Sequence, residues 1–210
     1  MKQSESTHYQ SLYKLAATLN SARSPQQIVR SIVEDVAKAM GAKGCSLMLL
    51  TPDKKVLLRT ASYGLSEWYA RKGPVFADSS ISETLKDKPV AILDATADAR
   101  IQYQKQLKEE GIASVLSVPV KLREKVIGVM RVYTAEPRHF TDSDIDFATA
   151  AANFGALALE NVRFYETLQK DYDVFVADML QWRADLGYEW MIEQPTVPAR
   201  ESGPVIPHGG

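Results

Sequence analysis

The chain has 210 residues, enough for one domain with a sizeable hydrophobic core and an additional helix or tail. Its 25 lysines and arginines nearly balance 26 aspartates and glutamates, so we expect neither nucleic acid nor an anionic membrane as a partner. The single cysteine, Cys45, excludes an intramolecular disulfide and, with the absence of a signal-peptide pattern or a long apolar run, predicts a cytoplasmic protein.

The first part of the sequence predicts two helices. Residues 1–8 are polar, and we expect them to form a disordered start. Between residues 9 and 19 apolar side chains recur at helical spacing, which predicts a short helix with one apolar face. Ser24 and Pro25 suit the N-cap and the first position of a second helix, and Gln27 is placed to complete a capping box.

Two β-hairpins follow, with shorter elements between them. Apolar runs at residues 45–50 and 56–63 flank a polar turn, and runs at 112–120 and 126–133 flank another. Glycines and prolines divide the sequence between the hairpins into short segments. The predicted elements there are helical segments at 65–71, 81–88 and 101–110, a loop at 72–80 and a strand at 89–93.

The second hairpin leads into a strongly marked helix start. Thr141 suits the N-cap, Asp144 can close a capping box, and Phe140 can pack onto Ile145 as a hydrophobic staple. The alanine-rich segment that continues to Tyr165 carries two apolar stripes. One stripe can cover a sheet, and the other requires a second helix.

The C-terminal part of the sequence is expected to be an extension of this domain. Residues 171–193 are predicted as a helical extension, and residues 194–210 as a flexible tail rich in proline and glycine. Apolar residues alternate at spacings of three and four, as in a coiled coil, at Leu168, Tyr172, Phe175, Met179, Trp182 and Leu186. The alternative, a helix that folds back on its own domain, stays open.

The order of these features resembles a GAF domain, a small-molecule-sensing and dimerising module of signalling proteins that is related in fold to PAS domains. The motifs that carry the resemblance are Tyr63-Gly64, the proline-started strand that ends in Asp94, Gly111-Ile-Ala-Ser114 with Val118-Pro119, and Phe-Thr-x-x-Asp at 140–144. We assign residues 9–170 to this domain. The resemblance implies a mixed α/β (α+β) fold with a central antiparallel sheet of about six strands. The terminal helices would pack on one face of the sheet, and short helices and loops would form a roof over a ligand pocket on the other.

The charged residue of the last strand is the first candidate for ligand binding. If Met130 and Val132 face the terminal helices, strand alternation places Val129, Arg131 and Tyr133 under the roof. A buried guanidinium group requires a carboxylate or phosphate partner. Two interpretations of Arg131 therefore stay open: an ion pair with an acidic residue of the roof, or an anchor for an anionic ligand.

Further candidates follow from the resemblance and from the aromatic residues. Positions that contact the ligand in cyclic-nucleotide-binding GAF domains correspond to Ser46, Tyr63, Ile81 and Ser82. That class has Asn-Lys where this chain has Thr134-Ala135, so a cyclic nucleotide is not expected. The aromatic residues of the roof segment, which can stack on a planar ligand or fill a second core, are Tyr63, Trp68, Tyr69, Phe76 and Tyr103. The predicted ligand-binding set is Ser46, Tyr63, Trp68, Tyr69, Ile81, Ser82, Tyr103 and Arg131.

Other chemistries of the family are not expected. Bilin photoreceptors attach their chromophore to a cysteine of the roof, which has none here, and methionine sulfoxide reductases of this fold use several cysteines. The three histidines lack the spacing of metal ligands, so we expect no metal site and no haem or iron. We predict that the protein is not an enzyme, and the identity of a cofactor stays open.

These observations predict a sensory, regulatory GAF domain that binds an unidentified small molecule and couples it to helix-mediated homodimerisation in signal transduction. A separate signalling partner protein is a further expectation. The predicted dimer interface is Leu12, Leu19, Ala152, Gly155, Leu159 and Val162. A ligand-free dimerisation or interaction scaffold is the alternative. A methionine sulfoxide reductase is the third interpretation, disfavoured by the single cysteine.

Overall fold

The computed structural model describes residues 2–19, 24–77 and 82–185. Within these ranges, side chains are described except at 2–7, 19, 25, 162–169, 183 and 184. The chain divides into two compact units, Met1–Tyr165 and Glu166–Gly210, and each is described by itself.

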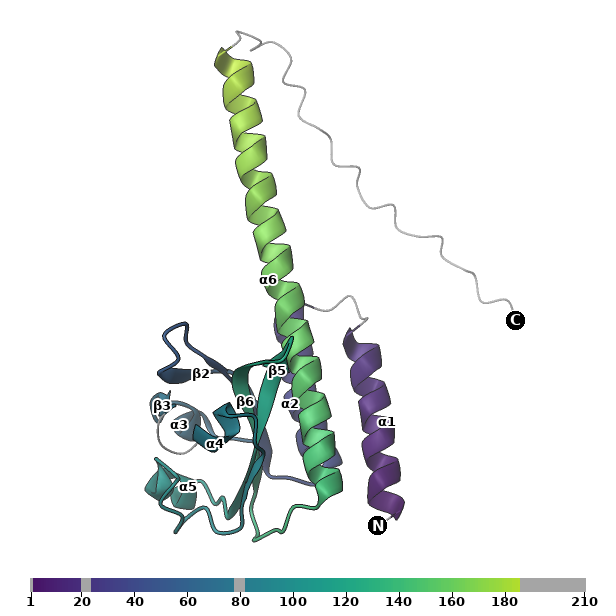
Figure 1. Ribbon diagram of the computed structural model, residues 1–210, viewed down its shortest axis with the longest axis vertical. Coiled ribbons are helices and arrows are strands. Elements are labelled where there is room, and N and C mark those ends of the chain that lie inside the picture. The colour runs from purple at the N-terminus through teal and green to yellow at the C-terminus, as the bar shows by residue number, and fades with distance from the viewer. Residues whose placement is uncertain (1, 20–23, 78–81, 186–210) are drawn as a thin grey trace, which may run out of the picture. The chain divides into compact units, whose positions relative to one another are not determined.

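The described residues of the first unit form a mixed α/β fold (Figure 1). The elements in chain order are α1 (Lys2–Leu19), α2 (Pro25–Ala39), β1 (Gly44–Leu50), β2 (Val56–Tyr63), α3 (Glu67–Ala70), β3 (Val75–Phe76), α4 (Ser82–Leu85), β4 (Val90–Ile92), α5 (Gln104–Glu109), β5 (Ser114–Leu122), β6 (Lys125–Thr134) and the start of α6 (Asp142–Asp185). Within the described ranges six strands pair antiparallel in the order β3-β2-β1-β6-β5-β4. The predicted fold class is confirmed.

Local sequence signals account for the ends of several elements. Ser24 and Gln27 form the predicted capping box of α2, since the Gln27 N–H donates to Ser24 Oγ and the Ser24 N–H donates to Gln27 Oε1. The β5–β6 hairpin turns at Arg123 and Glu124, which both have positive φ angles, 46° and 63°. This is the twist that a two-residue hairpin loop requires.

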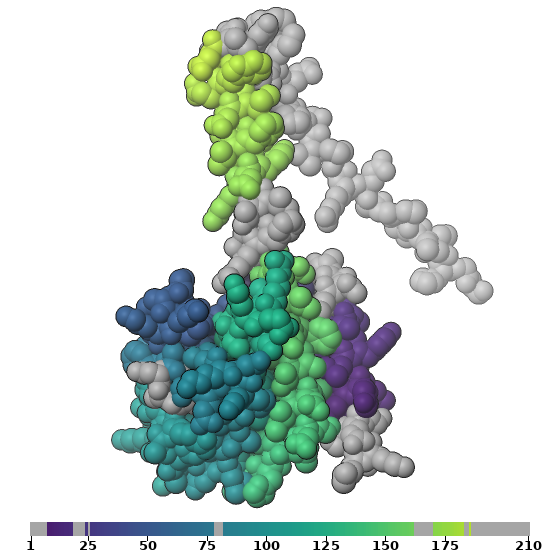
Figure 2. Space-filling model, in the orientation of Figure 1, coloured from purple at the N-terminus to yellow at the C-terminus, as the bar shows by residue number. Residues whose placement is uncertain are grey.

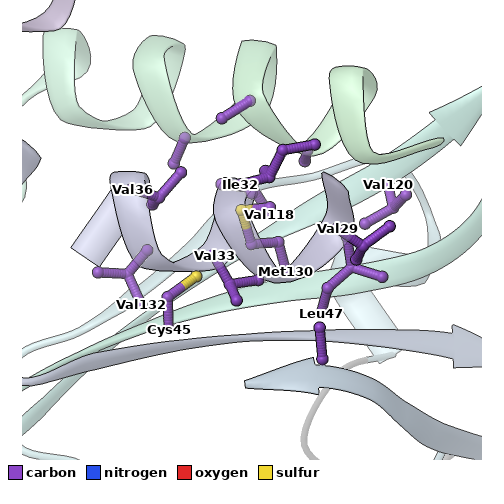
Figure 3. Packing of buried hydrophobic residues seen from close by; sticks show 14 of the residues in the cluster. Val29, Ile32, Val33, Val36, Cys45, Leu47, Val118, Val120, Met130 and Val132 are labelled. Atoms are coloured by element: carbon purple, nitrogen blue, oxygen red, sulfur yellow. The ribbon is translucent and has the colours of Figure 1, made fainter. Parts of the chain in front are cut away.

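The larger core lies between the sheet and the helices α2 and α6. Figure 3 shows Val29, Ile32, Val33 and Val36 of α2 beside residues of three central strands. The strand residues that it labels are Cys45 and Leu47 of β1, Val118 and Val120 of β5, and Met130 and Val132 of β6. Because one face of the amphipathic helix α2 meets the most buried strands, this cluster fixes the position of the whole sheet.

Helix α1 begins earlier than the sequence predicts. It starts at Lys2, so the expected disordered start at residues 1–8 is wrong for the described residues from 2 onward. His8 is buried, its ring stacks on Phe147 of α6 with centroids 4.5 Å apart, and its Nδ1 lies 3.2 Å from Ser143 Oγ. Figure 2 shows α1 in purple beside the first part of α6 in green. These tertiary contacts, which no local pattern announces, hold the first turns of the helix.

The small residues of α6 pack against the protein's own sheet. Ala152 is fully buried, and a Cβ atom added at Gly155 would lie 2.7 Å from Leu47 Cδ1 of β1. Leu12 and Leu159 are partly buried against the same core. The prediction that Ala152 and Gly155 form a dimer interface is therefore wrong, because the core of one chain already buries this stripe. Of the same predicted set, the side chains of Leu19 and Val162 lie outside those described.

The second face of the sheet is covered by α3, α4 and α5 (Figure 1). These helices confirm the predicted helical segments at 65–71, 81–88 and 101–110, and β4 confirms the predicted strand at 89–93. The expected loop at 72–80 contains β3, whose Val75 and Phe76 pair with Leu57 and Val56 at the edge of the sheet. We call α3, α4, α5 and β3, with their connecting segments, the roof.

In the second unit α6 continues to Asp185. Four residues of the predicted seam have exposed side chains, namely Tyr172, Phe175, Met179 and Trp182. Leu186 and the predicted tail at 194–210 lie outside the described residues, as does the side chain of Leu168. No described helix combines the length and the apolar character that crossing a lipid bilayer requires.

The packing of Gly155 gives a first test. Gly155→Leu should lower the free energy of unfolding by roughly 1–3 kcal/mol, because the new side chain overfills the space beside Leu47. Urea unfolding at several protein concentrations measures this change in the free energy of unfolding, which should not depend on the protein concentration. Leu157→Ala, at a position 47% exposed on the same helix, is the control and should stay within about 0.5 kcal/mol of the wild type. Equal stability of Gly155→Leu and the wild type would contradict the close packing.

Candidate ligand-binding site

Strand β6 sends alternate side chains to the two faces of the sheet. Met130 and Val132 belong to the core beneath the helices, whereas Val129 and Tyr133 belong to apolar clusters beneath the roof. Arg131, between them in the pattern, is only 4% exposed. The structure thus places Arg131 on the roof side, as alternation predicts.

A row of polar residues crosses the sheet beneath the roof. Ser62, Ser46, Arg131 and Ser117 are directly paired neighbours on β2, β1, β6 and β5. Among its contacts, Arg131 donates from Nε to Ser117 Oγ over 3.1 Å, and Ser46 Oγ shares a hydrogen bond of 3.0 Å with the Tyr133 hydroxyl. We call this row the polar seam.

Two apolar clusters cover the roof side of the sheet. The buried members of the first are Tyr69, Val90, Ile92, Ala95, Ile101, Leu107, Ile112, Val115 and Tyr133. The buried members of the second are Met48, Leu57, Val75 and Val129. On the two central strands the polar seam separates them, since Arg131 lies between Val129 and Tyr133, and Ser46 lies two residues before Met48. The roof side is therefore two small cores with a polar strip between them.

A β-bulge brings a second arginine to this face. Leu47 pairs with Ala61 and Met48 pairs with Arg59, so Thr60 is an additional residue in β2. Ala61 belongs to the core beneath the helices, and Arg59 turns to the opposite face, where its Cζ lies 5.7 Å from the ring centre of Tyr69. Without the bulge, the two residues would share one face.

Tyr69 lies at the centre of this arrangement. Its side chain is fully buried, and its ring meets Tyr133 edge-on with centroids 6.1 Å apart. Lys72 Nζ lies 3.3 Å from the centre of the Tyr69 ring. Helix α3 is held in place at Ser66, whose hydroxyl caps the Tyr69 N–H and donates to Glu110 Oε2 over 2.5 Å. The N-cap of α3 therefore fixes Tyr69 over the sheet.

Several buried polar atoms around Tyr69 have no hydrogen-bond partner within the part of the chain that the structure describes. They are Arg59 Nε, Arg59 Nη1 and the Tyr69 hydroxyl. Thr84 Oγ1 of α4 and Thr149 Oγ1 of α6 likewise lack a partner among the described residues. Buried polar groups in proteins are nearly always hydrogen-bonded, so such atoms require an explanation. A bound ligand with hydrogen-bond acceptors supplies one.

The site is electrostatically positive. Burial, reinforced by the charges of Arg59 and Arg131, lowers the pKa of Lys72 from 10.5 to about 6, and only Glu110 among the contributing groups opposes this shift. Burial also raises the pKa of the Tyr69 hydroxyl, and the neighbouring Tyr133 acts in the same direction. The site therefore disfavours a further positive charge and keeps the Tyr69 hydroxyl protonated, as a hydrogen-bond donor.

Three of the predicted ligand-binding residues come together here, namely Ser46, Tyr69 and Arg131. Tyr103 lies at the edge, with its hydroxyl donating to the Pro74 carbonyl over 2.9 Å and its ring centre 5.7 Å from Lys72 Nζ. Ser82 lines a separate groove of about 720 Å³ with residues that include Phe76 and Leu85. Ile81 lies outside the described residues.

Two predicted ligand-binding side chains are placed elsewhere. The Tyr63 ring packs against the core beneath the helices and lies 5.7 Å from Lys38 Nζ of α2, because Tyr63 pairs with Cys45, which faces the same way. Trp68 is 53% exposed on the outer surface of α3, where the helix directs Tyr69 inward instead. The assignment of Tyr63 to the pocket beneath the roof is therefore wrong. Trp68 lines a surface hollow of about 460 Å³ with Lys72, so its assignment to a ligand site stays a prediction.

The sequence interpretation missed Arg59, Lys72 and Ser117. Arg59 carried the same signal as Arg131, because it is the only charge in the strand Val56–Tyr63. Lys72 carried no such signal, since it lies in a short roof segment whose facing is set by tertiary packing.

Cys45 and the candidate metal-ligating side chains do not form a cluster in the described part of the chain. No group of three or more histidine, cysteine, aspartate or glutamate side chains is placed there to hold a metal ion. Cys45 is fully buried among apolar residues, and this burial raises the pKa of its thiol, which disfavours the reactive thiolate.

A second polar cluster joins the sheet to α6. The Arg138 N–H donates to Ser114 Oγ of β5 over 2.8 Å, and its guanidinium donates to the Met40 carbonyl at the end of α2 and, over 2.8 Å, to Asp144 Oδ1. Asp144 also accepts from the Thr141 N–H over 2.9 Å, while the Asp144 N–H donates to Thr141 Oγ1. The predicted capping box of α6 is confirmed, and this junction ties it to β5 and α2.

The comparisons with known proteins agree with this architecture. A family model described as a GAF domain matches residues 22–160, whereas no curated protein sequence matches the chain. The GAF domain of a phosphoenolpyruvate-protein phosphotransferase from Coxiella burnetii superposes with a TM-score of 0.69 at 19% identity, over 78% of this chain and 98% of that one. The corresponding GAF domain from Acinetobacter gives 0.63 at 23% identity, over 74% and 93%.

A structure with a different activity is also similar. Free methionine-R-sulfoxide reductase from Neisseria meningitidis superposes with a TM-score of 0.62 at 13% identity, over 75% of this chain and 91% of that one. At these identities the structural similarities support the fold, and the family model covers well over half of the chain. The chain therefore belongs to the GAF domain family, whose members are sensory and regulatory modules.

Proposed function

We propose that this protein is a regulatory GAF domain that binds a small molecule between the polar seam and Tyr69 and couples its binding to helix-mediated association. The observation that carries the proposal is the set of buried hydrogen-bond donors without partners in the described part of the chain, Arg59 Nε, Arg59 Nη1 and the Tyr69 hydroxyl. A domain that served only as a scaffold would gain stability from filling this region with apolar side chains.

The route from ligand to helix is short. Strand β6 carries Arg131 and Tyr133 under the roof and ends at Thr134, after which the chain reaches Arg138 and Asp144. Asp144 Oδ1 also lies 3.8 Å from Nε2 of His8, which connects the junction to α1. A shift of β6 upon binding would therefore act on the start of α6, on the end of α2 and on α1.

The association we propose uses surfaces that the chain leaves exposed. On α1, Tyr9 and Tyr13 are 75% and 78% exposed and lie one helical turn apart. In the second unit, Tyr172, Phe175 and Trp182 are also exposed, at spacings of three and seven. These are the candidate contacts of a homodimer, or of a separate signalling partner, in place of the buried Ala152 and Gly155.

An enzymatic function receives no support from the described residues. The similarity to a methionine sulfoxide reductase concerns the fold, and Cys45 is buried on the opposite face of the sheet from Arg131. A ligand-free scaffold is the alternative that the following experiment separates from the proposal.

Native mass spectrometry of the protein purified under mild conditions should detect a bound small molecule that denaturation releases. Arg131→Met should reduce its occupancy, with affinity falling at least about tenfold because a charge-assisted hydrogen bond is lost. Lys72→Met changes a residue outside the sheet and should also reduce the occupancy of the small molecule. It serves as the second variant if Arg131→Met folds poorly. Arg123→Met, on the exposed β5–β6 turn, is the control and should retain full occupancy. A wild-type protein with only the mass of the bare chain would favour the scaffold.

The junction is tested by Asp144→Asn, which keeps the size of the side chain and removes its charge. The free energy of unfolding should fall by roughly 1.5–3 kcal/mol, because hydrogen bonds to a charged group are lost at Arg138 and Thr141. The sedimentation of the variant should no longer respond to the small-molecule fraction released from the wild-type protein.

The control for this variant is Asp142→Asn, at an exposed position of the same helical turn. It should lose much less stability and should keep the response. If Asp144→Asn sediments and responds like the wild type, the junction does not transmit ligand binding.

A further inference from the structure

Three basic side chains from separate elements meet around one buried aromatic ring. Arg59 comes from β2, Arg131 from β6, and Lys72 from the segment after α3. The Tyr69 ring contacts Lys72 Nζ at 3.3 Å and Arg59 Cζ at 5.7 Å, and the charges of both arginines act on Lys72. The charges of the two arginines disfavour protonation of Lys72, so the arrangement is costly unless negative charge is nearby.

The acid that acts on this cluster is already engaged. Glu110 is the acidic group whose charge favours protonation of Lys72, and its two carboxylate oxygens accept hydrogen bonds from the Ser66 N–H over 2.8 Å and from Ser66 Oγ over 2.5 Å. Its role in fixing α3 limits what it can offer to Arg59. Two Arg59 nitrogens, Nε and Nη1, have no hydrogen-bond partner among the described residues. Their N–H groups point in different directions, so each is a separate donor for an oxygen of a bound carboxylate or phosphate.

We infer that the ligand of this domain carries an oxyanion, a carboxylate or a phosphate, that accepts hydrogen bonds from the Arg59 guanidinium group and from the Tyr69 hydroxyl. Arg131 and, once protonated, Lys72 supply further positive potential. This inference rests on the proposed function and specifies the chemical class of its ligand.

Anion binding should also change the protonation of Lys72. In the ligand-free protein its pKa is about 6, so the amine is mostly neutral at pH 7. The charged and titratable groups that face it are Arg59 from β2, Arg131 from β6, Glu110 after α5, and Tyr69 and Tyr103 from the roof. A bound anion favours the charged amine and raises its pKa, so binding near neutral pH should take up a proton.

The experiment is a calorimetric titration of the full-length protein with two probe anions, sulfate and acetate, at pH 7. Neither probe titrates near that pH, so proton uptake, measured from the dependence of the heat on the buffer, must come from the protein. We expect saturable binding of at least one probe with proton uptake. Tighter binding of sulfate would indicate a phosphate-bearing ligand, and tighter binding of acetate a carboxylate.

Substitutions assign the binding to the cluster. Arg59→Met keeps the apolar stem and should weaken probe binding at least about tenfold. Lys72→Met should abolish the proton uptake. Arg71→Met, adjacent to Lys72 but with a side chain 80% exposed, is the matched control and should bind like the wild type. Heats that do not saturate, or equal binding by Arg59→Met and Arg71→Met, would overturn the inference.

A second measurement needs no ligand. In a buffer of low anion concentration, Arg59→Met should unfold at a higher temperature than the wild type, because it removes two buried N–H groups that lack hydrogen-bond partners among the described residues. Lys72→Met should flatten the rise of stability with pH between about 6 and 10.5, the window in which the unfolded chain binds this proton and the folded one does not. A lower melting temperature for Arg59→Met, with Arg71→Met unchanged, would mean that Arg59 only stabilises the fold.

The inference and the proposed function can fail separately. A neutral or cationic molecule found by native mass spectrometry would leave the sensory proposal intact and overturn the oxyanion. Saturable anion binding that depends on Arg59, without any effect on sedimentation, would support the anion site and contradict the coupling to helix-mediated association.

Discussion

The central constraint in this structure is that both faces of one antiparallel sheet are buried. Along β6, Met130 and Val132 support the helices while Arg131 and Tyr133 lie beneath the roof. A single strand is thus part of the structural core and of the candidate binding site. Neither face can change without affecting the other, because successive side chains leave the same backbone in opposite directions. This is the physical basis for a sensor whose ligand and helices lie on opposite sides of a sheet.

Features that depend on neighbouring residues could be predicted from the sequence. The hairpins, the capping boxes at Ser24 and Thr141, and the facing of Arg131 all follow from local chemistry and from the two-residue period of a strand. The family resemblance added the roof, whose existence the local patterns alone did not require. The turn at Arg123 and Glu124 lacks the usual asparagine or glycine, yet the flanking strands still fixed its place.

Features that depend on contacts distant in sequence could not be predicted. A stripe of alanine and glycine permits close approach of any partner, and only the structure shows that Gly155 meets Leu47 of its own chain. The bulge at Thr60 reversed the facing of Arg59 relative to Ala61, and it also makes Tyr63 face the helices. The start of α1 depends on the contact between His8 and Phe147, which lie at opposite ends of the domain sequence. In each case the position of the residue is set by tertiary packing and not by local propensity.

The account depends on an imbalance of charge and hydrogen bonding beneath the roof, where Arg59, Lys72 and Arg131 surround Tyr69. The most direct measurement is the proton–nitrogen NMR correlation of the arginine Nε–H groups, recorded while sulfate is added to the protein. The account predicts a saturating shift of the Arg59 signal with no comparable change at the exposed Arg71. Shifts that are equal at both arginines and follow only ionic strength would contradict it.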